Sequence, residues 1–248
     1  MTEEKTKLID ENGIRTDGRK SDELRPVSIE LGYLKHADGS VLYEQGKCKI
    51  LVAVFGPSEV HPKHLELPDR AILRVRYHMA PFSVDERKSP APSRREMELS
   101  MVIRNALEPI MMTELFPRTV VEVFIEILQA DGGTRVAGLT AAALALADAG
   151  IPLRGIVSGC AVGKIDGTMV LDLNDTEDKE GDADMPIAYI PTMSKISLLQ
   201  MDGLLTREEF RQGISMAING SMKLYAMQVA ALKSKYNLPE GQEKEETQ

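Results

Sequence analysis

Apolar side chains recur every second residue in several short runs of the chain, which is typical of β-strands with one buried face. The clearest run is Ala71–Met79, where positions 73, 75, 77 and 79 are apolar or aromatic and positions 74, 76 and 78 are basic. The pattern predicts a half-buried strand there. Similar runs predict strands over Ser28–Leu34, Ser40–Gln45, Lys47–Phe55, Thr119–Leu128, Gly155–Lys164, Thr168–Leu173, Met185–Pro191 and Lys195–Gln200.

Three longer segments have the spacing of helices. Ser93-Arg-Arg-Glu96 is a capping-box pattern, and apolar residues at helical spacing continue to about Met112. Thr134–Ala149 is rich in Ala and Leu and ends at Gly150, which predicts a helix packed tightly on a sheet. Thr206-Arg-Glu-Glu209 begins a long helix that we expect to reach about Tyr236.

The order of these elements predicts the fold class and the domain organisation. Strands come first and then alternate with helices, so we expect an α/β domain with a mixed β-sheet and helices packed on it. We expect residues 1–24 to form a polar N-terminal arm, residues 25–236 the domain, and residues 237–248 an acidic, disordered tail. Gly56–Pro68 is interpreted as a loop because it contains three prolines.

Composition narrows the class of protein further. With 248 residues, 43% of them hydrophobic, the chain can bury a substantial core. Aromatic residues are only 4% and Trp is absent, so this core must be aliphatic. Cys48 and Cys160 lie in apolar runs and are interpreted as buried reduced thiols of a cytosolic protein. No signal-peptide pattern and no apolar run long enough to span a membrane is visible.

Negative charge is concentrated between two apolar runs. Residues 172–184 contain seven Asp or Glu and a single Lys, although the whole chain has a net charge of only −8. Carboxylates crowded in this way raise one another's pKa or hold a divalent cation. Either outcome suits acid catalysis at a phosphate ester, and a solvated acidic loop is the alternative interpretation.

Two predicted helix entrances are suited to anions. Gln129-Ala-Asp-Gly-Gly-Thr-Arg135 leaves a strand, turns on two glycines and enters a helix, whose free N–H groups favour an anion. Arg94 and Arg95 lie in the first turn of another helix, where cations oppose the helix dipole. Such a violation of a local rule indicates a functional site, although a solvated pair of arginines is the alternative. The loop that contains Lys63 and His64 is an exposed polar loop on sequence alone.

Taken together, these segments resemble the RNase PH family over residues 14–236, and within it the branch that contains the catalytic subunits of the archaeal exosome. The resemblance rests on the following motifs: Arg15-Thr-Asp-Gly-Arg19, Leu67-Pro-Asp-Arg70, Arg74-Val-Arg-Tyr77, Ser93-Arg-Arg-Glu96, Gln129–Arg135, Leu171-Asp-Leu-Asn174, Glu177-Asp178 and Ala183-Asp-Met-Pro186. It implies a fold like domain 2 of ribosomal protein S5.

The resemblance also implies an activity and a site. It implies a phosphorolytic 3′→5′ exoribonuclease that releases nucleoside diphosphates and, in reverse, adds 3′ tails. Asp178 and Asp184 match the catalytic carboxylates, and the same pair could hold Mg²⁺. Gly133, Thr134 and Arg135 match the site of inorganic phosphate, the co-substrate. RNA contacts are implied for Arg94, Arg95, Lys63 and His64.

The implied partners are an inactive RNase PH-like paralogue in a hexameric ring and RNA-binding cap subunits with S1 or KH domains. Three alternatives stay open at this point. The chain could be a bacterial-type RNase PH that trims tRNA 3′ ends, a ring subunit that binds RNA without catalysis, or a metal-dependent hydrolytic nuclease. The sequence does not divide the roles of general acid and metal ligand between Asp178 and Asp184.

Overall fold

The first half of the chain forms a five-stranded mixed sheet. The structure, a computed structural model, describes residues 7–10 and 13–236. The strand order is β1-β2-β3-β5-β4, in which β4 and β5 are parallel and the other neighbours are antiparallel. The bounds are β1 Val27–Leu31, β2 Gly39–Gln45, β3 Cys48–Glu59, β4 Ile72–Met79 and β5 Thr119–Gln129.

The second half forms a smaller antiparallel sheet. Its order is β10-β8-β6-β7, and β9 pairs with β8. The bounds are β6 Ser158–Ile165, β7 Thr168–Leu171, β8 Ala183–Ile190, β9 Lys195–Leu199 and β10 Asp202–Gly203. The α/β class predicted from the sequence is confirmed. The sequence predicts one mixed sheet, but the strands divide between two sheets. This division could not be predicted, because the spacing of apolar residues describes each strand separately and does not identify the strands with which it pairs.

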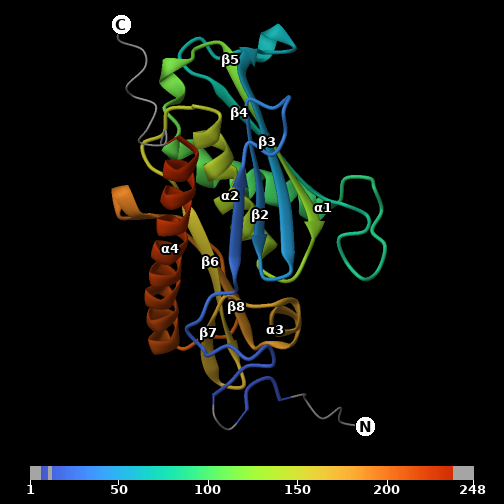
Figure 1. The fold of residues 1–248 in the computed structure, drawn as a ribbon, viewed down its shortest axis with the longest axis vertical. Helices are drawn as coiled ribbons and strands as arrows, with labels where there is room; N and C mark the ends of the chain where they lie inside the picture. The colour runs from blue at the N-terminus through green and yellow to red at the C-terminus, as the bar shows by residue number, and fades with distance from the viewer. Residues whose placement is uncertain (1–6, 11–12, 237–248) are drawn as a thin grey trace, which may run out of the picture.

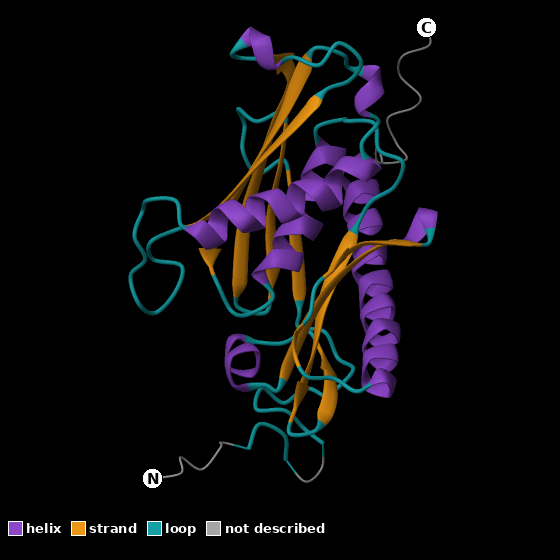
Figure 2. Ribbon diagram, turned by 180° about the vertical axis from the view of Figure 1, so that it is seen from behind, coloured by secondary structure: helices purple, strands orange, loops and turns teal. Residues whose placement is uncertain are grey.

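The helices join and cover these sheets (Figures 1 and 2). Helix α2 (Thr134–Asp148) packs against β2 and β3 of the first sheet and β6 of the second, so it forms the centre of the core. Helix α1 (Arg94–Leu107) packs against β4, and the long α4 (Arg207–Tyr236) runs along β6, β7 and β8. The short α3 (Asp175–Glu180) precedes β8. The buried core is dominated by Val, Ile, Leu and Ala, as the composition predicts.

Several boundaries differ from the sequence predictions for physical reasons. Strand β3 continues to Glu59, so the first residues of the predicted loop Gly56–Pro68 are extended and pair with β5. Helix α1 ends at Leu107, because Pro109 begins a 3₁₀ turn over Glu108–Ile110 in place of the predicted continuation to Met112. Three other 3₁₀ turns span Lys63–Leu65, Thr113–Leu115 and Pro191–Met193.

The predicted N-terminal arm is more buried than its polarity indicates. Leu8 and Ile9 pack against Ile165, Val170 and Leu173 of the second half of the chain. The predicted tail, residues 237–248, lies outside the described residues. Both cysteines are buried and free, as expected. Among residues 7–10 and 13–236, no helix combines the length and the apolarity that crossing a membrane requires.

Candidate active site

Four charged side chains from four separate elements line one pocket. They are Arg95 of α1, Arg135 of α2, Asp178 of α3 and Asp184 of β8. The pocket consists of two adjoining cavities of about 600 and 270 Å³, and all four residues line both. Lys179, next to Asp178, also lines both cavities. Residues far apart in the sequence therefore form a site in which Arg95 and Arg135 lie beside two carboxylates.

The N-terminus of α2 provides the anion-binding wall of this pocket. Gly132 and Gly133 both have left-handed backbone conformations, with φ of 70° and 63°, which turn the chain from β5 into the helix. Within the described part of the chain, no group accepts from the backbone N–H of Gly133, Thr134 or Arg135. These donors and the partial positive charge of the helix end suit a phosphate.

Thr134 is oriented by Tyr77, which the sequence shows only as part of an alternating strand and of one family motif. The hydroxyl of the buried Tyr77 on β4 donates a hydrogen bond of 2.9 Å to Thr134 Oγ1. The Thr134 oxygen thus accepts from Tyr77, which leaves the proton of the Thr134 hydroxyl free to donate to an anion in the pocket. Burial raises the pKa of Tyr77 to about 12, so Tyr77 stays a donor at neutral pH.

The two adjacent arginines of α1 have different positions. Ser93 caps the helix through the predicted capping box, in which its side chain accepts from Glu96 N and the Glu96 side chain accepts from Ser93 N. Both arginines are exposed, but this geometry places Arg95 in the wall of the pocket, whereas Arg94 lines neither cavity. Arg95 and Arg135 are therefore the arginines that face the carboxylates.

Asp178 lies on a helix that the sequence analysis missed. Asn174 accepts from Glu177 N at 3.0 Å, and the Glu177 carboxylate accepts from Asn174 N at 2.9 Å, which is a second capping box. This Asn-x-x-Glu pattern was the available signal for α3. The surrounding protein removes hydration from Asp178 and raises its pKa, and the nearby Arg95 opposes that shift.

Asp184 has the more strongly perturbed carboxyl group. Its position on β8 pairs it with Gly163 of β6 on one side and with Asp202 of β10 on the other. Its Oδ1 is buried without a hydrogen-bond partner among the described residues. Burial, together with the negative charges of Asp178 and Asp202, raises the pKa of Asp184 to about 7, while Arg135 opposes the shift. A carboxyl group in this state can hold a proton near neutral pH.

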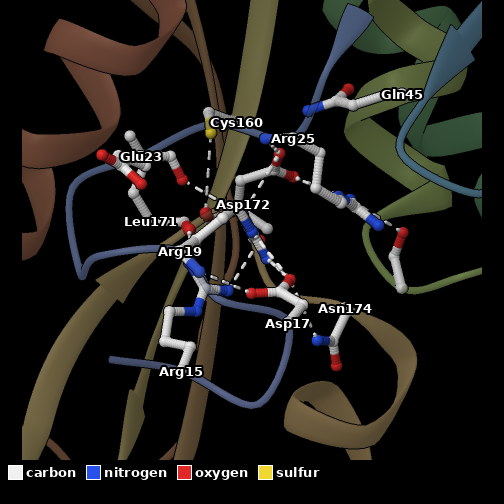
Figure 3. Close-up of polar contacts among 12 residues, drawn as sticks. Arg15, Asp17, Arg19, Glu23, Arg25, Gln45, Cys160, Leu171, Asp172 and Asn174 are labelled. Atoms are coloured by element: carbon white, nitrogen blue, oxygen red, sulfur yellow. Dashed lines mark hydrogen bonds and ion pairs between the residues drawn. The ribbon is translucent and has the colours of Figure 1, made fainter. Parts of the chain in front are cut away.

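Behind the pocket lies a cluster of buried arginines, which Figure 3 shows around Asp172. The Arg25 guanidinium binds the Asp172 carboxylate at 2.7 Å, and Arg15 pairs with Glu177 of α3. The sequence analysis used Arg15 only as part of a motif and assigned Arg25 no role. Buried charges of this kind cannot be found from periodicity, because their partners are more than 140 residues away in the chain.

The pair Asp178 and Asp184 fits the requirements of Mg²⁺. This ion is usually held by one or two carboxylates, with water and substrate phosphates completing its octahedron. Both carboxylates line the same cavities, and the buried Oδ1 of Asp184 has no protein partner in the described part of the chain. Across the described ranges, no group of three or more His, Cys, Asp or Glu side chains is arranged to hold a metal.

Lys63 and His64 are far from this pocket. They are exposed in the 3₁₀ turn that follows the end of β3. The start of β3, in contrast, lies at the loop Asp131–Gly133, here called the glycine loop, because Cys48 Sγ contacts the carbonyl oxygen of Gly132. A strand of 12 residues spans about 36 Å at 3.3 Å per step, so the two ends of β3 are well separated. Asp182, in contrast, is an exposed residue of the pocket wall.

Comparison with protein-family models gives two matches. The model described as "3' exoribonuclease family, domain 1" matches residues 23–152, and the model described as "3' exoribonuclease family, domain 2" matches residues 155–220. Together these matches cover most of the chain. The boundary between them falls between α2 and β6.

Curated relatives cover nearly the whole chain. The chain is 63% identical over 233 residues to the exosome complex component Rrp41 of Thermococcus onnurineus, covering 94% of each protein. It is 62% identical over 230 residues to the component of the same name from Pyrococcus furiosus, covering 93% of this chain and 92% of the relative. The Rrp41 of Nitrosopumilus maritimus is 59% identical over 229 residues, covering 92% of this chain and 94% of the relative.

Solved structures share the fold. The crystal structure of rice Rrp46 superposes with a TM-score of 0.78 at 25% identity, covering 88% of this chain and all of that one. A chain of the Archaeoglobus fulgidus exosome with RNA bound to the active site gives a TM-score of 0.76 at 23% identity, covering 87% and 93%. The second likeness concerns the fold alone.

Proposed function

The chain belongs to the 3′ exoribonuclease family, in agreement with the resemblance to RNase PH seen in its motifs, and we propose that it is the catalytic, phosphate-dependent subunit of an exosome. The proposed reaction shortens RNA from its 3′ end with inorganic phosphate and releases nucleoside diphosphates. The family match and the relatives named exosome component support the assignment to RNA degradation.

The single observation that supports phosphate dependence is that one pocket contains both an anion site and a carboxyl group whose pKa is raised to about 7. Gly133, Thr134 and Arg135 offer backbone, hydroxyl and guanidinium donors, and Asp184 faces the same cavity with a pKa of about 7. A nuclease that uses water as nucleophile needs no second phosphate site. Two phosphate groups brought together repel each other, and Arg95 and Arg135 supply the compensating charge.

The proposed step is an in-line exchange of one P–O bond for another. An oxygen of inorganic phosphate, held at the N-terminus of α2, attacks the phosphorus of the last phosphodiester. The bond from that phosphorus to the 3′ oxygen of the preceding nucleotide breaks, and the 3′ oxygen takes its electron pair. Asp184 donates a proton to this oxygen, so the products are a nucleoside 5′-diphosphate and an RNA with a free 3′ hydroxyl.

Asp178 would hold Mg²⁺ when it is bound, and Asp184 would join it as a ligand only in its ionised form; the ion would neutralise charge on the reacting phosphates. In the protein itself, burial and the negative charge of Asp178 raise the pKa of Asp184 to about 7, so Asp184 can carry a proton near neutral pH. Arg95 reduces the charge repulsion at Asp178 and is oriented by the Ser93 capping box. The two aspartates therefore have different roles, with Asp184 as the acid.

We further propose that the chain acts in a hexameric ring with an inactive RNase PH-like paralogue, under cap subunits with S1 or KH domains. The names of its curated relatives, which are components of a complex, support an assembly. In such a ring, Lys63, His64 and Arg94 would contact RNA upstream of the 3′ end, because they lie outside the pocket. The two buried free thiols are consistent with a cytoplasmic location.

Product analysis tests this function. The complex isolated through an affinity tag on this chain is incubated with a 5′-labelled oligoribonucleotide, with and without phosphate. We expect nucleoside diphosphates, formed only when phosphate is present. Nucleoside monophosphates formed without phosphate would instead identify a hydrolytic nuclease, and absence of decay in both conditions would identify a non-catalytic ring subunit.

A further inference from the structure

Arg25 lies where three segments of the site meet, although it does not line either cavity of the active-site pocket. It is 5% exposed and precedes β1. Its backbone N–H and its guanidinium both bind the carboxylate of Asp172, at 2.8 Å to Oδ2 and 2.7 Å to Oδ1. Asp172 follows β7 and leads into α3, the helix that bears Asp178.

The same guanidinium reaches the loop of the anion site. Nη1 donates to the carbonyl oxygen of Asp131, and Nη2 lies 3.4 Å from the carbonyl oxygen of Gly132. A planar guanidinium can bridge two such acceptors in fixed directions, which a lysine ammonium cannot do. Arg25 therefore joins the glycine loop directly to the segment that leads to the carboxylates.

Other contacts hold the loop against the same segment. Cys48 Sγ accepts from Asp131 N at 3.1 Å and donates to the Gly132 carbonyl at 3.2 Å. Asp175 N, in the first turn of α3, donates to Asp131 Oδ1 at 3.3 Å. The backbone of Gly132 also lies against Asn174, the N-cap residue of α3. The approach is so close that a Cβ on Gly132 would lie 2.6 Å from the carbonyl carbon of Asn174.

The charge state of the Arg25–Asp172 pair is fixed. Burial opposes ionisation of Asp172, but the Arg25 guanidinium outweighs it and keeps the pKa of Asp172 below its ordinary value. A buried ion pair contributes little net stability compared with well-packed apolar side chains. The best-supported role of such a pair is to favour one arrangement of the groups around it. Here those groups are the Asp131–Gly133 loop and the segment from Asp172 into α3, which lie on either side of the active site.

We propose that Arg25 is a positioning residue for phosphorolysis, which holds the Asp131–Gly133 loop at the correct distance from the segment that carries Asp178. The expected effect of Arg25 on the rate of phosphorolysis rests on the proposed function. Its expected effect on the affinity of the protein for inorganic phosphate does not, because that affinity can be measured without turnover.

The test compares the same substitution at two buried arginines of one cluster. Arg25→Lys keeps the charge but loses the guanidinium fork that bridges Asp131 and Gly132. Arg15→Lys is the matched control, because Arg15 is also buried and binds Glu177 and the carbonyl oxygens of Leu171 and Asp172, but does not contact the loop. Inorganic phosphate is titrated into each full-length protein by calorimetry, and each melting temperature is measured.

We expect Arg25→Lys to weaken phosphate binding by at least about fivefold, the factor that corresponds to about one lost hydrogen bond, and Arg15→Lys to change it less than about twofold. In phosphorolysis, Arg25→Lys should raise the KM for phosphate, whereas Arg15→Lys should leave that KM nearly unchanged, because only Arg25 contacts the Asp131–Gly133 loop.

A smaller loss of phosphate affinity in Arg25→Lys, or an equal loss in Arg15→Lys, would overturn the positioning role. If Arg25→Lys does not fold, Asp172→Asn is measured in its place, because it removes the charge at the other end of the same link with nearly unchanged shape. Failure of both variants to fold would also overturn the proposal, since the pair would then serve stability alone. If the wild type binds phosphate but releases no diphosphates, the proposed function fails while the role of Arg25 in binding is still measured.

Discussion

Asp184 of β8 and Asp202 of β10 are directly paired residues of two antiparallel strands, and both line the active-site pocket. Two carboxyl groups in this relationship cannot both ionise freely, and Asp202 contributes to the raised pKa of Asp184. The sequence alone gives Asp202-Gly203 the composition of a turn and does not show this pairing. The pairing across the sheet is what gives Asp202 its influence on the proposed acid.

Removal of the charge on Asp202 should therefore move the pH dependence of the enzyme. Asp184 must be protonated to act as an acid, so forward phosphorolysis should fall as pH rises through about 7. Asp202→Asn lowers the pKa of Asp184 and should shift this alkaline limb to lower pH. A pH–rate profile of kcat/KM measures the shift, with Asp182→Asn as control, because Asp182 also lines the pocket but is not among the charges that raise the pKa of Asp184. Equal shifts in the two variants would argue against a specific effect of Asp202.

Substitution of either carboxylate of the pocket should stop turnover without releasing RNA. Asp184→Asn should lower the phosphorolysis rate by about 10²–10⁴-fold, the usual contribution of a general acid, and Asp178→Asn should also lower it, because Asp178 raises the pKa of Asp184 and would hold Mg²⁺. Binding of RNA should be equal or tighter, because Asp178→Asn removes a repulsive charge and Asp184→Asn leaves a neutral group of the same shape. Filter binding and single-turnover assays check both expectations. Asp182→Asn makes the same change of charge in the pocket wall as Asp178→Asn. A loss of rate in Asp182→Asn as large as that of the other two variants would show that bulk charge, not a named role, explains the effect.

The same carboxyl group should reduce stability at alkaline pH. The folded-state pKa of Asp184, about 7, lies above its ordinary value, so the folded protein binds the proton more tightly than the unfolded chain. Stability is then lost as pH rises from about 4 through 7. Asp184→Asn, which stays neutral, should melt higher than wild type at pH 8, by about 2–4 °C for each kcal/mol gained. Thermal melts at pH 8 and pH 4 check this, because the difference should nearly vanish at pH 4.

Arg135 and Arg94 should differ in their effect on phosphate. Arg135 lines both cavities beside the free N–H groups of α2, so Arg135→Ala should raise the KM for phosphate by about 10- to 100-fold, as expected for loss of a charge-assisted hydrogen bond. Arg94 lies outside the pocket, and Arg94→Ala should weaken RNA binding with little change in that KM. Steady-state kinetics at varied phosphate, together with RNA binding, separate the two. Similar increases in the phosphate KM would contradict the geometry.

The contact between the glycine loop and the cap of α3 can be tested with a matched pair of glycines. Gly132 and Gly167 both have positive φ, so Ala at either site costs about 1–2 kcal/mol of backbone strain. Only at Gly132 does the added Cβ meet backbone atoms, those of Asn174, whereas nothing lies within 4 Å at Gly167. Gly132→Ala should therefore lose more stability and activity than Gly167→Ala, and equal melting temperatures would show that the loop can move away from α3 without cost.

Much of this site could be predicted from residue types and their spacing, and the remainder depends on contacts that are distant in sequence. The capping box at Ser93 and the helix entrance at Gly133 were visible because they are local patterns. The cluster of Arg15, Arg25 and Asp172 was not visible, since a buried arginine looks like a surface arginine until its partner is known. The sequence shows Tyr77 as a buried position of β4, because its ring fits the alternation of that strand. Its hydroxyl contact with Thr134 could not be predicted, because the two residues are brought together only by tertiary packing.

The most direct test of the account follows the bond that inorganic phosphate is proposed to form. The tagged complex is incubated with unlabelled RNA and ³²P-labelled inorganic phosphate, and the released nucleotides are separated by chromatography. We predict that the label appears in the β-phosphate of nucleoside diphosphates in wild type and is absent in Asp184→Asn. Release of nucleotides from RNA without incorporation of the label would contradict the central claim, because the attacking oxygen would then come from water.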